Sequence, residues 1–131
     1  MIMNFPEDLK YTREHEWARV KGKRVVVGIT EFAQDQLGDI VYVELPSVGD
    51  EVKKGEAFGV VESTKAVSDL FAPVSGKVVE VNDPLSDAPE TINEDPYEEG
   101  WMIAVEASDL KDLDDLLGAK DYAKFVEEEQ E

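Results

Sequence analysis

Hydrophobic and polar residues alternate along most of the chain in short runs separated by turn residues, which is the pattern of β-strands. The first two runs flank the tight turn Lys21-Gly22-Lys23 and therefore predict a hairpin. The predicted strands cover residues 17–20, 24–29, 40–45, 51–52, 57–62, 77–81 and 101–106. Because side chains alternate along a strand, we expect Val41, Val43 and Leu45 to share one face of the third strand.

Helical signals occur at two places. Thr30 is a suitable N-cap for a short helix over residues 31–37, and Gly38 stands where a left-handed residue would end it. Near the C-terminus, Ser108 can cap a second helix that Gly118 closes. Its apolar positions recur at helical spacing and are Leu110, Leu113, Leu116 and Leu117.

Beyond that point, Tyr122, Phe125 and Val126 continue the helical period for another turn or two. The glutamate-rich residues 127–131 are expected to fray. Residues 85–100 are polar and predict a loop.

These elements predict one domain over residues 1–131, with a core over about residues 10–106 and a helical segment over residues 108–126. Many short antiparallel strands and few helices favour a mainly β fold, either a small β-sandwich or a flattened barrel with short helices. With 42% hydrophobic residues, a chain of 131 residues can bury a core of its own.

Charge and composition narrow the function. The chain has 31 Asp and Glu against 13 Lys and Arg, a net charge of −18, which disfavours binding to nucleic acids and to anionic membrane surfaces. It has no cysteine and one histidine, His15, so disulfides, thiol nucleophiles and cysteine-bound metals are excluded. No apolar run is long enough to span a membrane, and the N-terminus lacks the features of a targeting segment. We therefore expect a soluble, cytoplasmic protein that lacks the usual residues of an enzyme, and a mitochondrial matrix protein only if the chain is a processed one.

Oxygen ligands occur together at Asn93-Glu94-Asp95, but they lack the spacing and the central glycine of a calcium loop. No metal site is expected there or elsewhere.

Lys65 lies between two similar halves of the chain. Gly55 stands ten residues before it and Gly76 eleven residues after it, so Lys65 would lie at the tip of the hairpin that joins the halves. Its neighbours are small or short polar residues that leave the side chain uncrowded. From spacing alone, Lys65 is either an ordinary exposed lysine in a turn or a functional one.

Four separated segments of the chain carry distinctive motifs. They are YTREHEW at 11–17, GITEFAQDQLGD at 28–39, VESTKA at 61–66 with APVSG at 72–76, and NEDPY at 93–97 with GWMI at 100–103. These motifs, in this order, resemble the glycine cleavage system H protein family, which carries lipoic acid, and the resemblance covers residues 10–126.

The resemblance implies a carrier and not an enzyme, with the fold of the biotinyl/lipoyl-carrier (hybrid motif) type. Lys65 would hold lipoic acid as lipoyllysine after modification by a lipoate ligase or lipoyl transferase. The arm would take an aminomethyl group from the pyridoxal-phosphate-dependent glycine decarboxylase and pass it to the tetrahydrofolate-dependent aminomethyltransferase. Dihydrolipoamide dehydrogenase would then reoxidise the arm.

By position in the family, Glu16 and Asp69 would hold the aminomethyl-bearing arm in a cleft, with His15 nearby as weaker support. Two alternatives keep the fold but change the role: a relay or depot that passes lipoyl groups to other proteins, and a biotinyl carrier. Biotin carriers usually have methionines beside the modified lysine, where this chain has Thr64 and Ala66.

Overall fold

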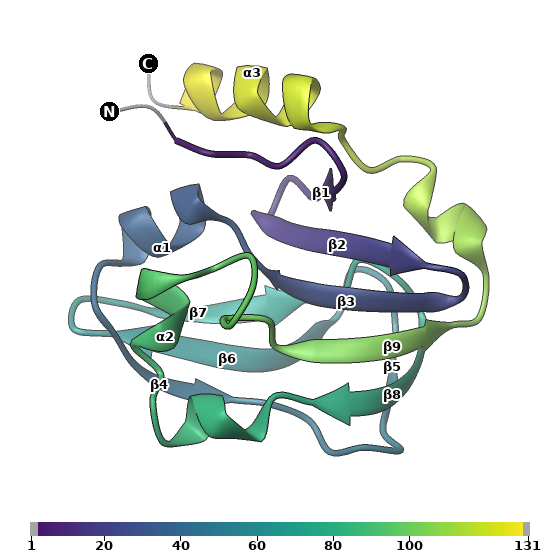
Figure 1. Ribbon diagram of the computed structural model, residues 1–131, viewed down its shortest axis with the longest axis horizontal. Helices are drawn as coiled ribbons and strands as arrows, with labels where there is room; N and C mark the ends of the chain where they lie inside the picture. The colour runs from purple at the N-terminus through teal and green to yellow at the C-terminus, as the bar shows by residue number, and fades with distance from the viewer. Residues whose placement is uncertain (1–2, 130–131) are drawn as a thin grey trace.

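The computed structural model describes residues 3–129 as two antiparallel sheets that lie over one another (Figure 1). The larger sheet has the strand order β1-β2-β3-β9-β8-β5 and the smaller one the order β4-β6-β7. The strands are β1 (Lys10–Tyr11), β2 (Glu16–Lys21), β3 (Arg24–Ile29), β4 (Ile40–Glu44), β5 (Glu51–Val52), β6 (Ala57–Ser63), β7 (Val67–Phe71), β8 (Gly76–Val81) and β9 (Ile103–Ala107). The helices are α1 (Glu31–Leu37), α2 (Thr91–Glu94) and α3 (Ala119–Glu129), with 3-10 turns at Asp83–Ser86 and Leu110–Leu113. The predicted mainly β, flattened two-sheet fold is confirmed.

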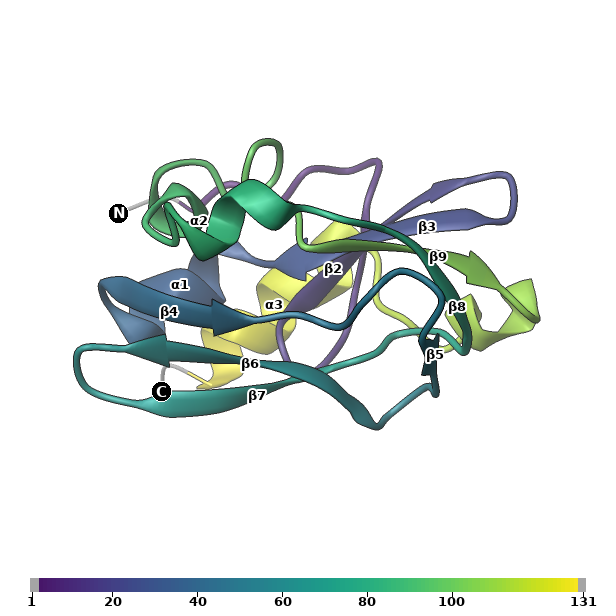
Figure 2. The ribbon, with the colours of Figure 1, turned by 90° about the horizontal axis from the view of Figure 1, so that it is seen from below.

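The two halves around Lys65 form nested hairpins. Strand β6 pairs with β7, and β5 pairs with β8 outside them. Backbone hydrogen bonds tie the halves together further from the tip, where the Gly55 amide donates to the Ala72 carbonyl over 2.9 Å and the Ala72 amide donates to Glu56 over 3.0 Å. In Figures 1 and 2, the β6–β7 turn, α1 and the end of α3 lie at the same end of the molecule. The hairpin therefore presents its tip close to two helices.

Two apolar clusters hold the layers together. The main core fills the space between the sheets and includes Val25, Val61, Leu70 and Val105. A second, aromatic cluster lies between the larger sheet and α3, where the rings of Tyr11 and Tyr122 stack with centroids 4.6 Å apart. The C-terminal helix is therefore anchored to the sheet by buried rings.

Helix α1 has its predicted bounds and N-cap, and the Thr30 hydroxyl accepts a hydrogen bond from the Ala33 amide. Gly38 ends the helix with a positive φ of 80°, but its ψ of −153° is not that of the left-handed helical conformation expected there. The predicted hairpin of β2 and β3 is also confirmed, with Lys21 opposite Arg24.

The expected faces of the third strand were wrong. A β-bulge between Ile40 and Tyr42 shifts the register of β4, so Ile40 and Val43 are buried while Val41 is 54% exposed. A bulge inserts one extra residue on one strand, and strict alternation along the sequence does not reveal where it falls.

The C-terminal segment also differs from its prediction. Residues 110–113 form one 3-10 turn, whose N-cap is Asp109 and not Ser108. Gly118 precedes the long helix instead of ending it, and Glu127–Glu129, expected to fray, belong to α3. Leu117 makes a β-bridge with Tyr11, and this tertiary pairing overrides the helical spacing of the leucines. Residues 130 and 131 lie outside the described part.

Residues 85–100 are not a plain loop. They contain α2 and the end of a 3-10 turn, and bury Leu85, Ile92 and Tyr97. Elements of four residues are too short to show a period in the sequence. Within residues 3–129, no helix is both long and apolar enough to cross a membrane.

Two leucines of one 3-10 turn test the packing of this segment. Leu113 is 5% exposed in the main core, whereas Leu110 is 39% exposed. We expect Leu113→Ala to lower the free energy of unfolding by about 2–5 kcal/mol, because it leaves a cavity, and Leu110→Ala to lower it by less than about 1 kcal/mol. Urea unfolding of both variants measures the difference, and equal losses would contradict the described packing.

Candidate functional site

Lys65 is exposed at the tip of the β6–β7 hairpin, as predicted. The Ser63 amide donates to the Ala66 carbonyl over 2.8 Å, and the Ser63 hydroxyl oxygen accepts from the Ala66 amide over 3.0 Å. The Thr64 amide donates to the carbonyl of Asp39 over 3.1 Å, which joins the tip to the end of α1. The turn therefore has a defined backbone while the lysine side chain stays accessible.

The lysine side chain lies over Gly38. A β-carbon added at Gly38 would lie 3.4 Å from Lys65 Cε and 3.9 Å from Nζ. The φ of 80° at Gly38 is also one that other residues adopt only with strain. Glycine at this position therefore both ends α1 and leaves space beside the lysine.

Asn93 holds this end of α1 in place, a role that the sequence did not reveal. Its side-chain oxygen accepts from the Ile40 amide over 2.8 Å, and its side-chain nitrogen donates to the carbonyl of Gly38 over 2.8 Å and to Gln34 over 2.9 Å. In the sequence, Asn93 is one of three adjacent oxygen-bearing residues, and neither their spacing nor their composition indicates this role. The signal that could have indicated it is its position within a segment that resembles the family.

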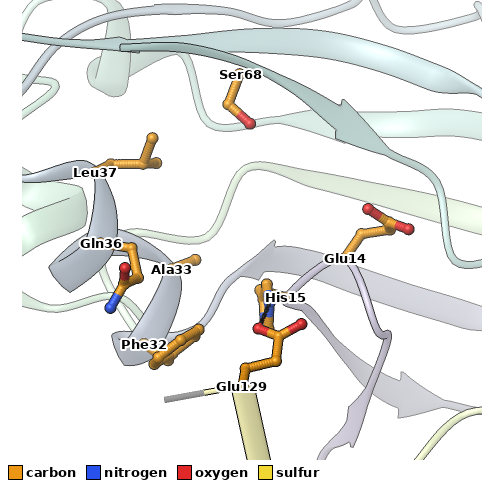
Figure 3. Close-up of a pocket in the computed structure, with 8 residues that line it drawn as sticks. All are labelled: Glu14, His15, Phe32, Ala33, Gln36, Leu37, Ser68 and Glu129. Carbon is orange, nitrogen blue, oxygen red and sulfur yellow. Dashed lines mark ion pairs between the residues drawn. The ribbon is translucent and has the colours of Figure 1, made fainter. Parts of the chain in front are cut away.

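A cavity of about 580 Å³ lies beside the hairpin (Figure 3). Side chains from α1 form an apolar wall, and Ser68 of β7 lies across from them. The opposite end is polar and is formed by the segment before β2 and the last residue of α3. The lining residues are Glu14, His15, Phe32, Ala33, Gln36, Leu37, Ser68 and Glu129.

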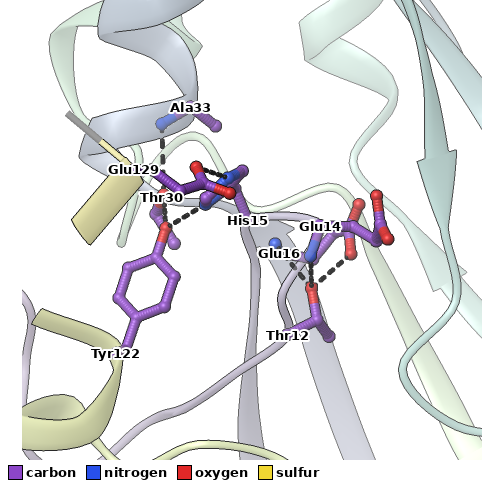
Figure 4. A network of polar contacts seen from close by, with 8 residues as sticks. All are labelled: Thr12, Glu14, His15, Glu16, Thr30, Ala33, Tyr122 and Glu129. Atoms are coloured by element: carbon purple, nitrogen blue, oxygen red, sulfur yellow. Dashed lines mark hydrogen bonds and ion pairs between the residues drawn. The ribbon is translucent and has the colours of Figure 1, made fainter. Parts of the chain in front are cut away.

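His15 lies at the polar end in a strained conformation. Its φ is 73°, in the left-handed region, which costs a residue with a β-carbon about 1–2 kcal/mol. Its Nδ1 lies 2.8 Å from the Tyr122 hydroxyl, and its Nε2 lies 3.0 Å from Oε2 of Glu129 (Figure 4). Tyr122 shares a further 2.7 Å hydrogen bond with the hydroxyl of Thr30. His15 is thus held on both ring nitrogens by residues of α3, and Tyr122 in turn bonds the N-cap of α1.

Glu16 lies elsewhere, beside a smaller cavity of about 180 Å³ that Lys54 and Phe71 also line. The side chain is 2% exposed. Its Oε1 accepts from the Thr12 hydroxyl over 2.6 Å and its Oε2 from the Phe71 amide over 3.2 Å. Both donors favour the carboxylate, but burial outweighs them and raises the pKa of Glu16 to about 8.

Asp69 does not join the other predicted residues. It lies opposite Val60 in the β6–β7 pairing, and its side chain is exposed. Its neighbours Ser68 and Leu70 alternate to the other face, where Ser68 lines the larger cavity and Leu70 enters the core. Of the three residues expected in the cleft, the structure places only His15 in the larger cavity beside the hairpin.

Comparisons with known proteins identify the family. Residues 9–129 match the family model described as glycine cleavage H-protein. The chain is 77% identical to the glycine cleavage system H protein of Anaeromyxobacter sp. (strain K) over 128 residues, which are 98% of this chain and 100% of that protein. It is 61% identical to that of Carboxydothermus hydrogenoformans over 126 residues, which are 96% and 97% of the two chains.

The chain belongs to the glycine cleavage H-protein family. A crystal structure of the glycine cleavage system H protein from Mycobacterium marinum superposes with a TM-score of 0.85 at 47% identity, and the match covers 92% of this chain and 97% of that one. The resemblance inferred from the four sequence segments is therefore confirmed over the full length of an H-protein. Among residues 3–129, the structure brings together no group of three or more side chains suited to bind a metal.

The buried Glu16 should make the stability of this H-protein depend on pH. The folded protein holds the carboxyl proton up to a pKa of about 8, whereas in the unfolded chain the group ionises near its ordinary value of 4.5. Stability from this group is therefore fully present below the unfolded pKa and is lost as the pH rises toward 8. Because Gln cannot ionise, Glu16→Gln should gain roughly 2–4 kcal/mol over the unchanged protein between about pH 5 and pH 9.

Chemical unfolding of both proteins at a series of pH values gives this difference, in which the titration of all other groups cancels. A difference in free energy that does not vary with pH would show that Glu16 is ionised in the folded protein.

Proposed function

We propose that Lys65 carries lipoic acid and that the chain is the lipoyl carrier of the glycine cleavage system. As a member of the H-protein family it is a carrier subunit and not a catalyst. The observation that carries the assignment of Lys65 is its position: an exposed lysine at a defined hairpin tip, beside a glycine and on the hairpin whose residue Ser68 lines a cavity with an apolar wall. These are the features that a covalently attached arm needs.

The residues around Lys65 fit a lipoyl group. The attached group supplies a dithiolane that can accept the aminomethyl group of glycine and then carry electrons as a dithiol. Gly38 leaves the base of the arm uncrowded. Phe32, Ala33 and Leu37 offer an apolar surface on which its hydrocarbon part can rest.

The partners that follow are glycine decarboxylase, aminomethyltransferase and dihydrolipoamide dehydrogenase, with a lipoate ligase or lipoyl transferase that attaches the arm. We place the carrier with them in the cytoplasm. Glu62, Asp39 and Asp69 surround the hairpin on a chain of net charge −18, so partners that present basic rims fit it best. No nucleic acid or membrane partner is proposed.

The cavity lined by His15 is the place where we propose that the arm docks. From the family's cleft positions alone, Glu16 and Asp69 are proposed as further residues of the cleft, although neither lines this cavity. The bond from the Phe71 amide to Glu16 ties β2 to the strand that carries Asp69.

Replacing the lysine tests the assignment. Lys65→Arg keeps the positive charge but removes the amine that can be acylated, so we expect no lipoyl group on the variant. Lys77→Arg, at an exposed lysine of β8, is the matched control and should be lipoylated normally. Intact mass after expression with an active ligase measures both.

The same experiment separates the alternatives. A lipoyl group on Lys65→Arg would contradict the assignment, and a mass increase that matches biotin on the unchanged protein would favour the biotinyl carrier. Lipoylated protein that passes its lipoyl group to other apoproteins, but supports no glycine cleavage with the purified partner enzymes, would favour the relay.

A further inference from the structure

We propose that Glu129, the last described residue of α3, is the carboxylate that binds the cationic end of the arm-borne aminomethyl group, and that His15 positions it. This inference rests on the proposed function and deepens it, because it names a residue that neither the motifs nor the family's cleft positions indicated. Figure 3 shows Glu129 and His15 side by side at the polar end of the cavity, opposite Ser68.

Few of the carboxylates near the hairpin reach the cavity. Only two line it, Glu14 and Glu129, among the residues that the structure describes. Glu16 faces the smaller cavity, and its pKa of about 8 leaves it mostly uncharged at neutral pH. Asp69 lies on the outer face of β7. A cation that enters the cavity therefore meets the charge of Glu14 and Glu129.

The C-terminal end of α3 is negatively charged. A helix carries partial negative charge at its C-terminal end, and α3 has no basic residue in its last turn to offset it. Glu127, Glu128 and Glu129 add three carboxylates there. Of these three, Glu129 is the one that lines the cavity. The end of α3 is therefore a favourable place for an ammonium group.

A chain of hydrogen bonds runs from the start of α1 to Glu129 (Figure 4). The Ala33 amide donates to the Thr30 hydroxyl oxygen, which shares a bond with Tyr122, and Tyr122 shares one with Nδ1 of His15. Burial raises the pKa of Tyr122 well above its usual range, so its hydroxyl keeps its proton. When each hydroxyl donates onward, Nδ1 of His15 accepts and its Nε2–H points at Oε2 of Glu129.

The contacts of His15 hold its strained backbone conformation in place. The left-handed backbone is held because both ring nitrogens and both backbone groups have partners: its amide donates to the Thr12 carbonyl over 3.2 Å, and its carbonyl accepts from the Thr30 amide over 3.1 Å. Through its Nε2–H, His15 orients one oxygen of Glu129. The second oxygen is then available to the amine.

The bound carboxylate would protect the cargo. Loss of the aminomethyl group to water breaks its C–S bond: the nitrogen lone pair expels the sulfur, which keeps the bonding electrons and takes a proton. Water provides the oxygen of the formaldehyde and the nitrogen leaves as ammonia. A protonated amine has no free lone pair for this step, so a carboxylate that favours the ammonium form slows the loss.

The test measures the decay of the isolated, aminomethylated carrier. We expect Glu129→Gln to lose the group roughly three- to tenfold faster than the unchanged protein, because one charge-assisted contact at a half-exposed site is lost. Glu128→Gln makes the same charge change one residue away and should decay at the unchanged rate. His15→Asn tolerates the left-handed backbone but does not span Tyr122 and Glu129, so it should decay like Glu129→Gln, and the double variant no faster.

A second readout needs no arm. His15 is the only histidine, so its ring nitrogens are the only imidazole signals in a ¹⁵N NMR spectrum. At mildly alkaline pH we expect the Nε2–H tautomer in the apo protein, and a mixture of tautomers in Glu129→Ala but not in Glu128→Ala.

Successful loading of all variants shows that the proposed function holds whatever the decay rates are. Equal decay of Glu129→Gln and Glu128→Gln, faster decay only in Asp69→Asn or Glu16→Gln, or an Nδ1–H tautomer in the apo protein would each overturn the inference.

Discussion

The arrangement of the site depends on one buried hydrogen bond, between the hydroxyls of Thr30 and Tyr122. Thr30 is fully buried and begins α1, whose other end supports the lysine hairpin through Gly38 and Asp39. Tyr122 anchors α3 in the aromatic cluster and orients His15. Each hydroxyl has a second partner, the Ala33 amide for Thr30 and Nδ1 of His15 for Tyr122, so the bond joins two sets of contacts, and its loss should cost about 1–3 kcal/mol. The bond therefore sets the distance between α1 and α3, the two helices that frame the larger cavity.

Glu16 and Glu129 differ in how deeply their carboxyl groups are buried. Glu16 is buried next to β7 and is expected to hold a proton at neutral pH, so its effect there is on stability and on the link between the sheets. Glu129 stays partly in water, with 39% of its side chain exposed, at the polar end of the larger cavity. Burial lowers the stability of a charge, whereas partial exposure beside an apolar wall retains it while still strengthening its attraction for a cation. A partly exposed carboxylate at the end of a helix, such as Glu129, is therefore better suited to bind a cation in the cavity than a fully buried one such as Glu16.

Sequence reasoning predicted the parts whose signals are local. The cap at Thr30, the stop at Gly38, the first hairpin and the exposed tip at Lys65 follow from turn and capping chemistry within a few residues. The predictions that were wrong depend on distant contacts: the bulge at Val41 is set by pairing with β6, and the start of α3 by the bridge between Leu117 and Tyr11. Asn93 and Glu129 were missed for the same reason, because their partners lie 53 residues or more away or across the fold. No spacing rule shows which of 31 acidic residues lines a cavity.

The central claim is that the cavity between α1, β7 and α3 receives the arm carried by Lys65. Nuclear Overhauser effects from the arm of the aminomethylated protein test it most directly. The account predicts contacts from the arm to the methyl groups of Ala33 and Leu37, and none to the exposed Val48, which lies outside the cavity. An arm without contacts to Ala33 and Leu37, and as mobile as in the unloaded lipoyl protein, would contradict it.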